Sequence, residues 1–85
     1  MQVMHIESLE IVGPVTVLTG TVQNEAISVG QSFHLTAIDG RRDTVTIVGI
    51  TPKDFAAPGS IVKVLVRRTD PMFDVAPGMT LRKIR

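Results

Sequence analysis

Cysteine is absent from the 85-residue sequence. This absence excludes disulfide bonds, thiolate metal ligands and a cysteine nucleophile. It also fits a reducing compartment, so the cytoplasm is the expected location. Tryptophan and tyrosine are absent as well, and there are three phenylalanines. Stacking on nucleic-acid bases, which depends on exposed aromatic rings, therefore has few candidate residues.

A strong charge of one sign and a long hydrophobic run are also missing. The formal net charge is +1, which supplies no global attraction to nucleic acid or to an anionic membrane. No apolar run approaches the roughly 20 residues of a membrane-spanning helix. The first residues, MQVMHIESLE, lack the basic and apolar regions of a signal peptide. We therefore expect no membrane partner. Hydrophobic residues make up 44% of the chain, too many for a disordered protein.

What the sequence does contain is a series of short runs rich in valine, isoleucine and threonine, which is typical of β-strands. Within residues 15–22, the alternation places Thr16, Leu18, Gly20 and Val22 on one face. Further strands are expected at residues 3–12, 32–38, 44–50, 61–68 and 79–84.

Turn-forming residues separate these runs. Gly13-Pro14 ends the first strand, because proline cannot donate a hydrogen bond to a strand ladder. Asp39-Gly40 favours a tight hairpin turn. The one helical candidate is TPKDFAAPG, residues 51–59, whose start predicts a single helical turn.

These elements predict an all-β fold. No helix of useful length is expected to cover a sheet, so closure of the sheet is the simplest way to bury its inner face and remove its edges. We predict one domain, residues 1–85, that forms a single small closed antiparallel β-barrel of six or seven strands.

Five segments, in order, carry a family resemblance. They are TVLTGTV (16–22), ISVGQSFHL (27–35), TVTIVGI (44–50), APGSIVKVLVRR (57–68) and VAPGMTLRK (75–83). Together they resemble the second, β-barrel domain of translational GTPases such as elongation factor Tu, over roughly residues 4–84. The resemblance implies a binding domain that contacts the ribosome and tRNA. The positions that match the family's contacts are Ile6, Glu7, Leu9, and Gly49 to Pro52.

Three glycines have expected structural roles in such a barrel. Gly20, in mid-strand, would permit a bend or a close approach of two backbones. Gly30 and Gly78 end apolar runs, where a turn needs a positive φ. The phosphate loop G-x-x-x-x-G-K-[ST] is absent, so we expect no nucleotide and no GTP hydrolysis.

Catalytic and metal-binding patterns are weak. The two histidines, His5 and His34, have no carboxylates at ligand spacing, so no metal is expected. No nucleophile elbow accompanies the serines. Glu7 and Glu10 are three residues apart on a strand, which predicts opposite faces and a poor acid–base pair. We predict that the protein is not an enzyme and binds no cofactor.

Basic side chains are the main candidate binding residues. They are Arg41, Arg42, Arg67, Arg68, Arg82 and Lys83, with Arg85 beside the last two. On a closed barrel they could form a patch that meets phosphates. The competing interpretation is that charged residues at hairpin tips and strand edges keep the surface solvated.

Apolar loop residues provide the alternative interface, Phe55, Met72 and Phe73. Each phenylalanine is either an exposed anchor for a partner or a plug of a barrel end, and plugging is favoured. The leading hypothesis is a non-enzymatic module that docks on RNA, the ribosome or a translation-related protein. One alternative is an assembly module without an RNA role, with self-association as one form of assembly. Another is a mimic of a translation factor's surface.

Overall fold

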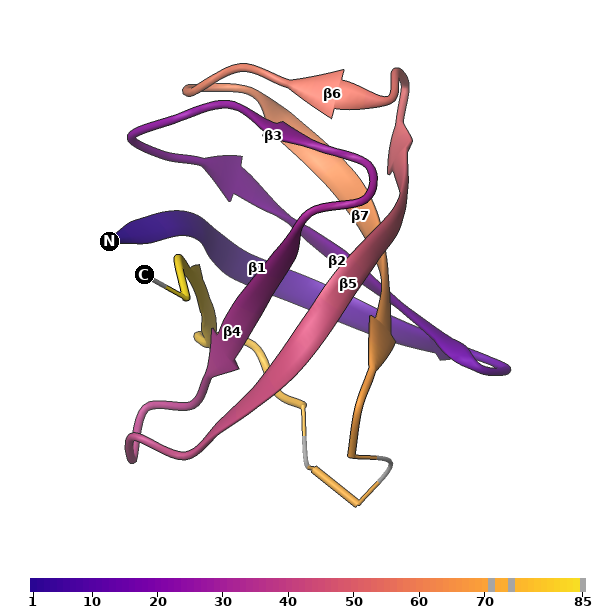
Figure 1. The fold of residues 1–85 in the computed structure, drawn as a ribbon, viewed down its shortest axis with the longest axis vertical. Helices are drawn as coiled ribbons and strands as arrows, with labels where there is room; N and C mark the ends of the chain where they lie inside the picture. The colour runs from indigo at the N-terminus through magenta and orange to yellow at the C-terminus, as the bar shows by residue number, and fades with distance from the viewer. Residues whose placement is uncertain (71, 74, 85) are drawn as a thin grey trace.

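A computed structural model of the protein describes residues 1–70, 72–73 and 75–84. These residues form β-strands and no helix (Figure 1). The strands are β1 (Gln2–Val12), β2 (Val15–Val22), β3 (Ile27–Ser28), β4 (Ser32–Thr36), β5 (Arg42–Thr51), β6 (Phe55–Ala56), β7 (Ile61–Arg68) and β8 (Thr80–Arg82).

Six of the strands form a closed barrel in the order β1-β2-β7-β5-β4-β8, and β8 returns to pair with β1. Every pairing is antiparallel. The predicted closed antiparallel barrel is therefore confirmed. Strands β3 and β6 pair with each other in a separate two-stranded sheet at one end of the barrel (Figure 1).

The barrel interior is filled by one of the two faces that the alternation predicts for each strand. On β2, Thr16, Leu18, Gly20 and Val22 are buried. Every barrel strand adds aliphatic side chains to one core, among them Met4, Leu18, Leu35, Ile47, Val64 and Leu81. Each of these is at most 1% exposed. Burial of such side chains is the main source of stability in a domain of this size.

Gly20 on β2 lies directly against the backbone of β1. A Cβ at this position would lie 1.9 Å from the carbonyl oxygen of His5, so no other residue fits without a shift of the backbone. The predicted close approach is confirmed. Gly30 and Gly78 have φ values of +97° and +93°, which confirms the positive φ expected at these turns.

The first strand departs from simple alternation. Its register against β2 shifts between Ile6 and Ser8, which marks a β-bulge. Ile6 and Leu9 both contact the core, and the intervening Glu7 is exposed. Because the bulge adds one residue, Glu7 and Glu10 both lie on the outer side of the strand. The prediction that they occupy opposite faces is wrong for this reason.

The helical turn predicted at residues 51–59 is also wrong. Phe55 and Ala56 instead pair with Ser28 and Ile27 as strand β6, and the amide of Val29 donates to the carbonyl of Asp54 at 2.9 Å. A tertiary strand partner has overridden the weak local preference for a helical turn.

The two loop phenylalanines have different environments. Phe73 is 8% exposed and belongs to the core, so it plugs a barrel end as expected. Phe55 is 58% exposed, so the prediction that it plugs the barrel is wrong. Its position in the β3–β6 sheet holds its ring outside the barrel.

Candidate functional site

Polar and basic side chains gather on the outer face of β8, β4, β5 and the end of β7. They alternate with buried core residues such as Leu35 and Val45, so they point outward. We call this surface the basic face. Its residues are Arg42, Arg67, Arg82 and His34, with the hydroxyls of Ser32, Thr36, Thr44, Thr46 and Thr80.

Strand register places these residues in rows across the sheet. One row runs from Arg82 through His34 to Thr44. A second row runs from Thr80 through Thr36 to Arg42. Arg42 and Arg82 therefore lie on the two strands that flank β4, in rows that are offset by two residues, so their positions are roughly 12 Å apart.

A third row joins Ser32, Thr46 and Arg67. The hydroxyls of Ser32 and Thr46 lie 3.0 Å apart and share a hydrogen bond. Because each hydroxyl can both donate and accept, the pair keeps the capacity to donate to an anion. The basic face thus combines guanidinium groups with hydroxyl donors.

Carboxylates are absent from the outward positions of the basic face. The one acidic residue in its strand segments is Asp43, which points inward and is 8% exposed. Its carboxylate accepts hydrogen bonds from the amides of Thr69 and Asp70, at 3.1 and 3.2 Å. In the described part of the chain, no ion pair involves Arg42, Arg67 or Arg82.

The other three candidate basic residues have partners. Arg41 pairs with Asp39 at the tip of the β4–β5 hairpin, with Nε 2.8 Å from Oδ2. The backbone amide and then the guanidinium of Arg41 lower the pKa of the Asp39 carboxyl. Arg68 lies at the barrel end, where Nη1 donates to the carbonyl of Phe73 at 2.5 Å.

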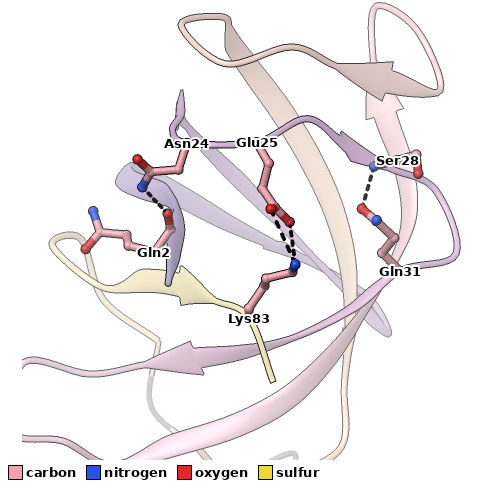
Figure 2. A network of polar contacts seen from close by, with 6 residues as sticks. All are labelled: Gln2, Asn24, Glu25, Ser28, Gln31 and Lys83. Atoms are coloured by element: carbon pink, nitrogen blue, oxygen red, sulfur yellow. Dashed lines mark hydrogen bonds and ion pairs between the residues drawn. The ribbon is translucent and has the colours of Figure 1, made fainter. Parts of the chain in front are cut away.

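Lys83 is held by Glu25, with Nζ 3.0 Å from Oε1 (Figure 2). The pair joins the segment after β8 to the turn after β2, where Asn24 also donates to the carbonyl of Gln2 at 2.6 Å. Lys83 is therefore part of a structural contact between the chain's two ends and this turn. Arg85 lies outside the described residues.

The apolar candidates do not form one surface. Phe55 is in β6, at one end of the barrel, whereas Met72 is in the loop at the opposite end (Figure 1). Both are exposed, by 58% and 84%. Phe73 is buried, so it is not available to a partner as the alternative interface requires.

Metal sites and membrane-spanning helices are the other two features considered. Within residues 1–70, 72–73 and 75–84, no group of three or more His, Cys, Asp or Glu side chains could hold a metal ion. The described chain also has no helix that is long and apolar enough to cross a membrane.

Charge is distributed unevenly along the sequence, a feature that the motif-by-motif predictions did not use. All nine lysines and arginines lie after residue 40, whereas four of the eight acidic residues lie before it. The first 40 residues thus carry a formal charge of −4 and the remainder +5, which sum to the net +1. Because the acidic and basic residues are concentrated in different halves of the chain, separate acidic and basic surface regions are expected. The strand faces that carry them depend on the fold.

Comparisons of the chain with protein-family models, curated proteins and solved structures find no match.

Proposed function

We propose that the protein is a non-enzymatic binding module whose basic face docks on the phosphate backbone of RNA. The observation that carries the proposal is the grouping of Arg42, Arg67 and Arg82 on a hydroxyl-rich face without outward carboxylates. Guanidinium groups make short, charge-assisted and often bidentate hydrogen bonds to phosphate oxygens. Neighbouring threonine hydroxyls would add neutral contacts of the kind that position nucleic-acid backbones.

The chemistry of the face favours the backbone over the bases. No phenylalanine, tyrosine or tryptophan lies among its outward residues, and His34 is only half-exposed, so base stacking has little support there. Binding would tolerate different sequences and weaken steeply with salt, because each phosphate contact releases condensed counterions. The resemblance to the barrel of translational GTPases supports ribosomal RNA or tRNA as the class of RNA.

The proposal is tested by fluorescence anisotropy with a labelled single-stranded RNA at several salt concentrations. The test variant is Arg42→Gln/Arg82→Gln. The matched control is Lys53→Gln/Lys63→Gln, which removes the same charge from exposed positions outside the basic face. We expect the test variant to bind at least about tenfold more weakly and to lose about 1.5 from the salt slope, and the control to lose less than about twofold. Equal losses in the two variants would contradict a localised site.

A second candidate function is a protein-binding or assembly module. Phe55 and Ile61, 58% and 70% exposed, line one hollow of about 350 Å³ together with Pro52. Exposed apolar residues that gather beside a hollow are a common feature of protein interfaces. An apolar partner would stay bound at high salt and after RNase treatment, and Phe55→Ala would release it. Loss of every partner on RNase treatment would favour the RNA-binding function.

A further inference from the structure

Strand β1 is paired on both sides for only half of its length. Strand β8 pairs with residues 2–5 of β1. The contact continues one residue further, where Ile6 donates to the carbonyl of Met79 at 3.0 Å and accepts from the amide of Gly78 at 2.9 Å. Beyond Ile6, residues 8–12 pair with β2 alone among the described residues.

The residues before β8 explain why its pairing stops there. Pro77 has no amide hydrogen to donate to a neighbouring strand. Gly78 has a φ of +93°, which turns the chain away from a strand path. The barrel is therefore closed at residues 2–6 of β1 and leaves an edge at residues 7–12. Figure 1 shows that the β1–β2 hairpin projects beyond the other strands.

Backbone hydrogen-bonding groups point out of this edge. Val12 and Val15 flank the two-residue turn of the hairpin and pair with each other. Because bonding alternates along an antiparallel strand, Ser8, Glu10 and Val12 bond to β2. Leu9 and Ile11 consequently direct their amide and carbonyl groups away from β2. An edge of this kind is a template for another strand.

The chemistry of the edge is acidic and apolar. Glu7 and Glu10 are exposed on its outer side, and neither is in an ion pair within the described chain. Ile11 and Val12 are 60% and 48% exposed. Neither β1 nor β2 contains a lysine or an arginine.

From these features we infer that residues 7–12 of β1 bind an extended segment of another protein, in which basic residues alternate with apolar ones. The segment adds to the barrel as a further strand and gains main-chain hydrogen bonds from Leu9 and Ile11. Its lysines or arginines meet Glu7 and Glu10 as cross-strand pairs of opposite charge. Its apolar side chains cover Ile11.

A second copy of this chain fits the edge poorly. In the symmetrical arrangement, in which each copy offers the same edge, the β1 edge of one copy would pair with the β1 edge of the other. That pairing sets Glu7 and Glu10 of both copies along one seam, where like charges repel. The bulge at Glu7 and the two carboxylates thus oppose self-pairing and select a basic partner.

The inference is tested with a synthetic peptide of alternating valine and lysine, long enough to cover the roughly 20 Å of the edge. Titration followed by two-dimensional NMR should shift the amides of residues 7–12 and protect those of Leu9 and Ile11 from exchange. A peptide with N-methylated backbone amides on its pairing edge keeps the charge and side chains but cannot form the ladder. We expect it to bind at least tenfold more weakly.

Protein variants separate charge from backbone pairing. Glu7→Gln/Glu10→Gln should weaken binding of the unmethylated peptide at least tenfold, whereas Glu25→Gln/Asp54→Asn, with the same change in net charge, should not. Both variants change exposed or half-exposed side chains, and circular dichroism checks their folding. The inference would be overturned if the methylated peptide bound equally well, or if the NMR shifts lay elsewhere on the barrel. It would also be overturned if sedimentation showed a dimer and NMR placed its interface at residues 7–12.

Discussion

The β1–β2 and β4–β5 hairpins use the same alternation but differ in what surrounds them. The β4–β5 hairpin lies between β8 and β7, so both of its strands have outer neighbours. The β1–β2 hairpin has β7 along β2, but β8 covers only the start of β1. The β4–β5 hairpin, which has outer neighbours along most of its length, therefore acts mainly through its side chains, whereas the β1–β2 hairpin also offers backbone hydrogen-bonding groups.

This difference explains why the two surfaces suit different ligands. A fully paired sheet that displays arginines and hydroxyls suits a charged ligand such as a phosphate backbone. An incompletely paired edge that displays carboxylates suits an extended polypeptide. Substitutions at comparable positions in the two hairpins test whether the hairpins differ in this way.

The largest effect is expected from glycine substitutions. Gly20→Ala places a Cβ 1.9 Å from the His5 carbonyl oxygen, whereas Gly49→Ala on β5 meets nothing closer than the side chain of Leu65, at 3.6 Å. We expect Gly20→Ala to lower the free energy of unfolding by at least about 3 kcal/mol. We expect Gly49→Ala to change it by less than about 1 kcal/mol. Urea unfolding followed by circular dichroism measures both, and equal losses would contradict the close approach of β1 to β2.

Isoleucine truncation should distinguish the buried strand from the projecting one. Ile47 on β5 is 1% exposed and Ile11 on β1 is 60% exposed. Ile47→Ala should cost about 2–5 kcal/mol through lost burial and a cavity. Ile11→Ala should stay within about 0.5 kcal/mol. Thermal unfolding is a suitable measurement, because each kcal/mol shifts Tm by about 4–8 °C in a domain of this size. A large loss for Ile11→Ala would show that the hairpin tip is packed.

The two parts of β1, residues 2–6 and residues 8–12, should differ in the exchange rates of their edge-facing amides. The amide of Ile6 donates to Met79 and that of Ile47 donates to Gln31, at 3.0 and 2.9 Å. The amides of Leu9 and Ile11 point to the edge and should exchange at least about 100-fold faster than these two. NMR-detected hydrogen–deuterium exchange on the unliganded protein measures the ratio. Strong protection of Leu9 and Ile11 without a ligand would mean that another segment already covers the edge.

The smallest effect concerns the tip of the β4–β5 hairpin. The backbone amide of Arg41, and secondly its guanidinium, lower the pKa of the Asp39 carboxyl. In Arg41→Gln the backbone hydrogen bond remains and the guanidinium is lost. The pKa of Asp39 should therefore rise toward its usual value without reaching it. Carboxyl-detected NMR titration measures this change, and an unaltered pKa would mean that the ion pair does not persist in solution.

Much of the fold follows from local patterns. Period-two alternation predicted which residues of β2 share a face, because a strand buried on one face needs that spacing, and the structure shows which of the two faces is buried. The need for positive φ at Gly30 and Gly78 also predicted their turns. The bulge at Glu7 could not be predicted, since it depends on how β1 pairs with β2. The same applies to residues 55–56, whose strand partner lies far away in the sequence.

The candidate site was only partly predictable for the same reason. Six basic residues were candidates, and the sequence does not distinguish Arg42, which faces outward without an ion pair in the described chain, from Arg41, which is paired with Asp39. Likewise, the sequence predicted loops for both Phe55 and Phe73, yet Phe55 is exposed in strand β6 and Phe73 is buried in the core.

Local sequence is enough to predict the β-strands, the residues that share a face of each strand, several turns and the excess of basic residues in the second half of the chain, because each depends on neighbours along the chain. Tertiary structure alone decided which strands are neighbours. That choice placed Arg42, Arg67 and Arg82 on one face and brought β8 against the start of β1. Closing a barrel joins residues far apart in sequence, and the resulting pairings depend on all six strands together.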